Sequence, residues 1–276
     1  MQDRLVSLLK WFSLRAHVFQ TGPVCRSTLF EAEDGFGYLH IVRDGRLRLE
    51  TAGRAPVEIA EPTLAFYMSP TTHRLVPAAS GTETVCASFE FDGGLRNPLV
   101  TALPDLILLP LIDLADLDAT LHLLFREAGE VHCGRQAILD RLAEVVIIQL
   151  LRDLMDKGRL DIGLLAGLAD PQLLKAINAM HDAPAEPWTL ATLAKVAGMS
   201  RARFAARFRE KVGATPLAYL GDYRVGVAQS MLRRGNSIQR AADATGYASA
   251  SAFSRAFSAL TGVSPRQWLN RLGDPH

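Results

Sequence analysis

Cysteine is scarce in this chain, and long uncharged apolar segments are absent. Three cysteines among 276 residues are too few for the disulfide framework of a small secreted domain, and no uncharged apolar run reaches the roughly 18 residues of a membrane-spanning helix. The first fifteen residues mix charges into their apolar pattern and include no small-residue cleavage site, so we expect no secretory signal. Together these absences favour a cytoplasmic protein that does not enter a membrane.

The composition predicts a folded protein whose two parts carry opposite charge. Hydrophobic residues make up 49% and charged residues 21%, which is ordinary for a globular protein, and the length suggests two domains. Residues 1–167 carry 16 Lys and Arg against 22 Asp and Glu, whereas residues 168–276 carry 14 against 7. The basic part is the one expected to meet a polyanion, unless the difference is only one between two solvated surfaces.

Short extended runs separated by turns occupy the first part of the chain. The runs 38–43 and 46–50 flank Asp44-Gly45, a pair typical of a tight hairpin turn because both positions tolerate a positive φ. Residues 83–91 alternate between apolar side chains on one face and mostly polar ones on the other. Several such strands predict a small β-barrel or sandwich.

From residue 113 to residue 158 the apolar positions recur with a helical period. The segment 143–151 is apolar around most of its circumference, apart from Glu144 and Gln149, which predicts a buried helix. We expect a homodimer that buries this helix against a partner chain, with packing inside its own domain as the alternative. Residues 158–167 then resemble a linker.

The last hundred residues contain a repeat. Five positions recur 49 residues apart: Phe204 and Phe253, Phe208 and Phe257, Gly213 and Gly262, Pro216 and Pro265, and Tyr219 and Trp268. Two further pairs, Ala194 with Ala242 and Gly198 with Gly246, recur 48 residues apart. Such regularity indicates a duplicated structural unit.

Each copy has the pattern of a helix-turn-helix. An alanine permits close approach of two helices, a glycine allows a left-handed turn, and Ser200 or Ser249 caps the next helix. The second helix of such a unit lies in the DNA major groove, and in the first copy it is rich in arginine. We therefore expect double-stranded DNA as a partner. The alternative, a helix-turn-helix that never touches DNA, is disfavoured by the duplication.

Residues 188–269 resemble the DNA-binding domain of the AraC-type transcription regulators. The resemblance includes the Gly-x-Ser/Thr-Pro sequences at 213–216 and 262–265 and the Gly-Tyr at 246–247. It implies two helix-turn-helix units joined by a long central helix at about 216–234. It also implies a regulator, more commonly an activator, that contacts RNA polymerase.

The family pattern assigns DNA-facing positions in both units. They are Arg201, Ala202, Arg203, Ala205, Ala206 and Arg207 in the first unit, and Ala250, Ser251, Ala252, Ser254 and Arg255 in the second. An alanine can contact a thymine methyl group but cannot hydrogen-bond to a base edge. Arg255 is therefore the residue most expected to contact a base.

The strands and the helices that follow them resemble the cupin-like sensor domain common in this family. In cupins, histidines of the first and second motifs converge inside the barrel, and His40 and His73 occupy approximately those places. With Cys25 and Cys86 they would give zinc two thiolate and two imidazole ligands. The alternative is that all four are fillers of the core. Cys133 is expected to be structural.

Two kinds of signal fit such a sensor. The placement of Cys25 and Cys86 resembles that in the reactive-chlorine-sensing regulators of the family, which implies oxidation of a cysteine, with zinc release as a compatible step. The alternative signal is a small organic effector bound inside the barrel. For an anionic effector, the recognition residues would be Arg43, Arg46 and Arg48.

As a whole, the sequence predicts an α+β protein with two domains and no enzymatic activity. We expect a cupin-like β-barrel sensor domain over residues 1–110, a helical dimerisation region and linker over 111–167, and an all-α domain with two helix-turn-helix units over 168–276. A metal-dependent cupin enzyme is a remote alternative, because Val42 stands where a second histidine of the first motif would lie. The duplication also disfavours a purely structural adaptor.

Overall fold

The computed structural model describes residues 4–33, 36–78, 81–92, 97, 99 and 103–272. These residues form two compact units. The β unit comprises residues 14–91 and 103–157, and the helical unit comprises residues 158–272 with the described residues of 4–13 and 92–99. The predicted α+β class is confirmed. Within the described ranges, no helix has both the length and the apolarity needed to cross a membrane.

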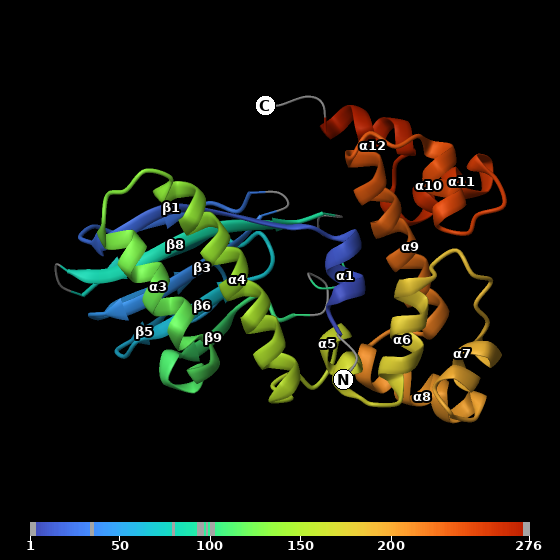
Figure 1. Cartoon of the computed structure of the whole chain (residues 1–276), viewed down its shortest axis with the longest axis horizontal. Helices are drawn as coiled ribbons and strands as arrows, with labels where there is room; N and C mark the ends of the chain where they lie inside the picture. Colours follow the sequence, from blue (N-terminus) through green and yellow to red (C-terminus); the bar gives the residue numbers. More distant parts are fainter. Residues whose placement is uncertain are drawn as a thin grey trace. The chain divides into compact units, whose positions relative to one another are not determined.

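Two antiparallel sheets make up most of the β unit (Figure 1). The first has the order β1 (Leu14–Val24), β8 (Thr82–Phe91), β3 (Gly37–Asp44), β6 (Thr63–Tyr67) and β9 (Ile107–Pro110). The second has the order β2 (Thr28–Phe30), β7 (His73–Pro77), β4 (Leu47–Thr51) and β5 (Val57–Ile59). Tyr38, Tyr67 and Cys86 of the first sheet share one buried cluster with Leu49 and Leu75 of the second, so a core lies between the sheets.

The expected hairpin at Asp44-Gly45 is wrong, although both of its strands exist. β3 pairs with β6 and β8, whereas β4 pairs with β5 and β7, so the chain passes from one sheet to the other at this turn. Gly45 does adopt a positive φ of 93°. A Cβ there would also lie 2.8 Å from the Thr82 Cα. The local turn signal was correct, but it carries no information about which strands pair.

Two helices cover the outer face of the first sheet in Figure 1. They are α3 (Asp118–Gly129) and α4 (Arg135–Asp156), preceded by short 3-10 turns at Leu111–Asp113 and Ala115–Leu117. The apolar segment of α4 is largely used internally, because Ala143, Val146 and Leu150 are fully buried within the chain. Val145 remains 41% exposed. The homodimer stays a prediction.

The helical unit consists of the N-terminal helix and eight further helices among its described residues. They are α1 (Val6–Trp11), α5 (Leu164–Ala169), α6 (Leu173–Asp182), α7 (Leu190–Val196), α8 (Arg201–Val212), α9 (Pro216–Arg233), α10 (Ile238–Ala244), α11 (Ala250–Thr261) and α12 (Pro265–Leu272). The ring of Phe12, which follows α1, packs edge-on against Tyr223. The Ser230 hydroxyl also donates a 2.6 Å hydrogen bond to the Trp11 carbonyl oxygen. These contacts attach α1 to α9.

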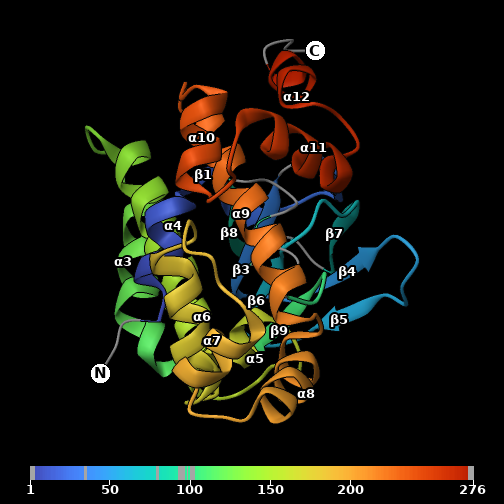
Figure 2. The ribbon, with the colours of Figure 1, turned by 90° about the vertical axis from the view of Figure 1, so that its right-hand side faces the viewer.

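The repeat forms two helix-turn-helix units, α7–α8 and α10–α11, and Figure 2 shows α9 connecting them. The predicted caps are confirmed: Ser200 accepts from the Arg203 backbone N–H, and Ser249 accepts from that of Ala252. Gly213 and Gly262 end α8 and α11 in the left-handed conformation. Phe204, Phe208, Phe253 and Phe257 are fully buried, so both copies fold alike.

The two turn glycines of the repeat provide a matched pair of substitutions. Gly198 and Gly246 have φ values of 66° and 77°, so alanine costs about 1 kcal/mol of backbone strain at either position. A Cβ on Gly198 meets nothing within 4 Å, whereas one on Gly246 would lie 2.8 Å from the Ala185 Cα and clash with its carbonyl. We expect Gly246→Ala to lower the free energy of unfolding by about 3 kcal/mol in total and Gly198→Ala by about 1 kcal/mol. Urea unfolding of both variants measures the difference, and equal losses would contradict the close approach.

Candidate functional site

The outward face of α8 is formed by small side chains flanked by arginines. Phe204 and Phe208 turn inward and are fully buried. On the opposite side, Ala202, Ala206 and Arg209 follow one another at helical spacing and are exposed. Arg201 and Arg203 are also exposed at the start of the helix. The face predicted to enter the major groove is therefore accessible, but its centre is almost without hydrogen-bonding groups.

Arg207 differs from the other arginines of α8, because it is held by an ion pair. Its Nε lies 2.6 Å from Oδ2 of Asp170, whose side chain is only 4% exposed. The other carboxylate oxygen accepts hydrogen bonds from the backbone N–H groups of Gln172 and Leu173. Burial alone would raise the pKa of Asp170, but these hydrogen bonds outweigh it and lower that pKa. A predicted DNA contact thus has a structural role within the helical unit, which the sequence pattern did not reveal.

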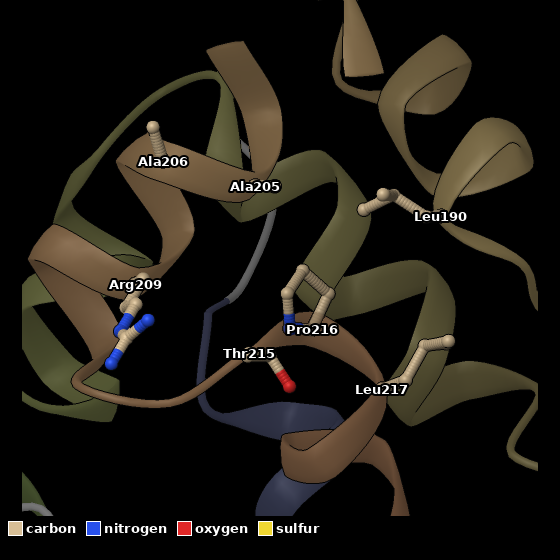
Figure 3. A pocket seen from close by; sticks show the side chains of 7 residues that line it. All are labelled: Leu190, Ala205, Ala206, Arg209, Thr215, Pro216 and Leu217. Carbon is tan, nitrogen blue, oxygen red and sulfur yellow. The ribbon is translucent and has the colours of Figure 1, made fainter. Parts of the chain in front are cut away.

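A cleft of about 360 Å³ adjoins the outward face of α8. Figure 3 labels its lining, which includes Ala205, Ala206 and Arg209 from α8, Leu190 from α7 and Leu217 from α9. Leu217 is 49% exposed. Two of the lining residues, Ala205 and Ala206, have small side chains. The cleft therefore places apolar surface beside the positions of α8 that are predicted to face the DNA groove.

The outward face of α11 is likewise made of small residues, with a single cation. Ser251 and Arg255 are exposed, and Ala250, Ala252 and Ser254 are half-buried. Phe253 and Phe257 anchor the helix on the opposite side, and Phe257 packs edge-on against Trp268. Arg255 is the only long polar side chain of α11. Its role as the main base contact of this unit stays a prediction.

Inside the β unit, His40 and His73 come together as predicted for the two cupin motifs. Their Nε2 atoms lie 2.7 Å apart, and both side chains are buried. Nδ1 of His73 donates to the Thr71 carbonyl oxygen, so its Nε2 accepts and His40 Nε2 donates. His40 Nδ1 is then a buried acceptor with no partner among the described residues.

Burial keeps this histidine pair neutral. It lowers the pKa of His73 to about 4, and it lowers the pKa of His40 well below its usual value, with the neighbouring His73 adding to the effect. Tyr67 stacks on His73 with ring centroids 4.0 Å apart and shares a hydrogen bond with the Thr51 hydroxyl. The histidine pair is therefore an uncharged polar group within a mostly apolar core at neutral pH.

The two predicted sensor cysteines lie in opposite environments. Cys86 is buried, pairs in register with His40, and has its thiol pKa raised to about 12 by burial. Cys25 follows the end of β1 and is exposed, as is Cys133. Among the residues described, no three or more His, Cys, Asp or Glu side chains are grouped so that they could hold a metal ion. The four-ligand zinc site stays a prediction, and we derive no step through a metal.

The three arginines expected to recognise an anion lie on the surface. Arg43 is 3.6 Å from Glu83, and Arg48 is 2.8 Å from Glu50. Arg46 is exposed at the same turn. Because these charges are exposed and two are paired with carboxylates, they do not form an anion site inside the barrel.

Comparison with known proteins identifies both parts of the chain. Residues 3–156 match the cupin family, and residues 193–271 match a helix-turn-helix domain family. The HTH-type transcriptional regulator AlkR of Acinetobacter baylyi is 34% identical over 64% of this chain and 60% of its own length. The RCS-specific HTH-type transcriptional activator RclR of Escherichia coli is 28% identical over 86% of this chain and 87% of its own length.

Other matches cover part of the molecule or have low sequence identity. A putative AraC-like transcription regulator of Streptomyces lividans is 40% identical over 46% of this chain. The chain spans 43% to 60% of the length of the Streptomyces and Acinetobacter relatives. The crystal structure of ToxT from Vibrio cholerae covers 96% of this chain and matches over its full length, at 16% identity and a TM-score of 0.43.

The Arg207–Asp170 ion pair predicts a division between structural and surface arginines of α8. Arg207→Ala leaves a buried carboxylate without its cation, so we expect the free energy of unfolding to fall by about 1–2 kcal/mol. Arg203→Ala, which removes an exposed side chain, is expected to change it by less than about 0.5 kcal/mol. Urea unfolding of the two variants tests this, and similar values for both would show that the ion pair does not stabilise the unit.

Proposed function

The chain belongs to the AraC family of transcription regulators that carry an N-terminal cupin domain, and we propose on that basis that it binds specific double-stranded DNA through α8 and α11. The observation that carries the proposal is the duplicated unit. Two helices with outward faces of small residues and arginine are fixed by equivalent phenylalanine pairs at the two ends of one helix, α9. The excess of Lys and Arg in residues 168–276 favours a polyanion.

The side chains available for recognition favour shape and methyl contacts over hydrogen bonding. Ala202, Ala205 and Ala206 let the α8 backbone approach base edges closely, and an alanine methyl packs against the C5-methyl of thymine. Arg201 and Arg203 are placed at the start of the helix, where contact with phosphate supplies affinity without specificity. Arg255 supplies a bidentate donor for a guanine. The DNA site would then contain thymine where α8 docks and guanine where α11 docks.

The rest of the regulatory apparatus follows from the family. A regulator of this type acts on transcription through RNA polymerase, and activation is the commoner behaviour. Most of α4 is used inside the β unit, but Ile138 and Val145 leave an exposed apolar strip that supports homodimerisation there. All named relatives above are transcription regulators, which supports a regulator rather than an enzyme.

Selection from a pool of random 30-base-pair duplexes by the purified full chain tests DNA binding. We expect one sequence to be enriched, and Arg255→Ala to weaken its binding by about 1–3 kcal/mol. Replacing a contacted thymine by uracil, which removes only the methyl group, should cost about 0.8 kcal/mol, or roughly fourfold in Kd. Arg126→Ala, on α3 of the β unit, is the control that should leave Kd unchanged. No enrichment would reject DNA binding, and indifference to uracil would reject the methyl contacts.

For the signal, we propose oxidation that begins at Cys25. Its thiol is exposed, whereas Cys86 is buried and its pKa of about 12 keeps it protonated, and the thiolate is the reactive form. Attack of the Cys25 thiolate on hypochlorous acid would give a sulfenic acid and release chloride. The similarity to RclR, whose name marks it as RCS-specific, supports this assignment. Cys86 would react only after the barrel opens.

Mass spectrometry of the chain after brief treatment with hypochlorous acid tests this order. We expect oxidation at Cys25 well before Cys86, and Cys25→Ser to abolish the effect of the oxidant on DNA affinity. Cys133→Ser, which removes the other exposed thiol, is the matched control and should leave that effect intact. Equal oxidation of Cys86 and Cys25 in the folded chain, or an unchanged response in Cys25→Ser, would reject the proposal.

A further inference from the structure

A second cleft, of about 680 Å³, opens in the β unit beside β1, β2 and β3. Its lining includes Phe19, Phe30 and Tyr38, with Glu31 and Glu33 from the segment that follows β2. Among the lining residues that the structure describes, none is a lysine or an arginine. The volume lies within the range of pockets that hold small organic molecules. The cleft is thus an aromatic site whose charged residues are acidic.

The aromatic rings form a continuous wall. Ring centroids of Phe19 and Phe30 are 5.8 Å apart, those of Phe30 and Tyr38 are 5.9 Å apart, and Phe19 meets Tyr38 edge-on. Phe19 is 41% exposed, which is unusual for so large an apolar side chain next to a core. Aromatic rings attract cations to their faces, so the wall can bind an apolar group and a positive charge together.

The electrostatic field in the cleft also favours a cation. Burial, and then the negative charges of Glu33 and Glu31, raises the pKa of Tyr38. The Tyr38 hydroxyl donates to the Glu31 backbone carbonyl oxygen at 3.0 Å, which holds that acidic segment against β3. His17, also in the lining, lies 3.4 Å from an oxygen of Asp140.

Two histidine rings lie behind the aromatic wall. Phe30 stacks on His73 with centroids 5.0 Å apart, and Tyr38 stacks on His40 at 6.2 Å. The carboxylates of Glu31 and Glu33 therefore make the lining acidic, which is the opposite of the arginine site that the sequence suggested for an anionic effector.

We propose that this cleft binds a small organic cation that carries an apolar group, such as an aryl-substituted quaternary or protonated amine. The aromatic wall formed by Phe19, Phe30 and Tyr38 takes the apolar group, and the carboxylates of Glu31 and Glu33 balance the charge. As an effector site it rests on the proposed function, because the β unit would then control DNA binding. As a binding site it stands on the cleft alone.

Isothermal titration calorimetry of the full chain with benzyltrimethylammonium tests the proposal, with benzoate as the anionic probe. Choline and its uncharged isostere 3,3-dimethylbutanol separate charge from shape. We expect benzyltrimethylammonium to bind at least tenfold more tightly than benzoate. Choline should bind at least tenfold more tightly than 3,3-dimethylbutanol. The double variant Glu31→Gln with Glu33→Gln should weaken the binding of benzyltrimethylammonium at least tenfold, and Phe19→Leu should weaken it about threefold to fivefold. Glu58→Gln, which changes an exposed carboxylate of β5, is the matched control and should bind like the parent chain.

Two results would overturn the cation site. One is benzoate binding as tightly as benzyltrimethylammonium, and the other is unchanged cation affinity in the Glu31/Glu33 double variant. If that variant does not fold, the exposed Phe19→Leu decides, and unaltered affinity there overturns the proposal. Calorimetry contains no DNA, so cation binding by a chain that enriches no duplex would reject the proposed function alone. Cation binding that leaves the affinity for a selected duplex unchanged would reject the effector role of the cleft.

Discussion

Each helix proposed to enter DNA is held by two phenylalanines one turn apart. Phe204 and Phe208 fix α8, and Phe253 and Phe257 fix α11, all fully buried. Burial of one such side chain contributes about 1.5–3 kcal/mol, and two on the same face set the rotation of the helix about its axis. Once that rotation is fixed, the residues exposed to DNA are determined. The character of the DNA-facing surface therefore depends on what lies opposite these rings.

The residues on the outward faces of α8 and α11, opposite the phenylalanines, are mostly small. The outward positions of α8 and α11 are alanine and serine with few arginines, and Arg207 is held by Asp170 within the helical unit. A surface of this kind gains specificity from close approach and methyl contacts, and gains affinity from phosphate neutralisation. In the β unit, burial keeps His40 and His73 neutral. The charge of the adjacent cleft is therefore set by Glu31 and Glu33.

Local sequence cannot report a distant partner, and the hairpin expectation was wrong for that reason. Asp44-Gly45 forms a turn with positive φ, yet its strands belong to different sheets, because pairing is decided by packing between sheets. Arg207 has the spacing of a DNA contact, but its partner lies 37 residues earlier in the chain. Cys25 and Cys86 both lie in the β unit, yet one is exposed and the other buried. Burial of that kind depends on elements far away in sequence.

The sequence by itself determined the α+β class and the two helix-turn-helix units with their serine caps and glycine turns. These features rest on local periodicity, on capping chemistry and on a duplication that is visible as a fixed spacing. The convergence of His40 and His73 was expected only because the first part of the chain resembles cupins. Tertiary structure alone decided the sheet order, the ion pair of Arg207, the attachment of the first helix to α9, and the acidic aromatic cleft. Each of these joins residues from separated segments, and only the packed chain brings their charges and burial together.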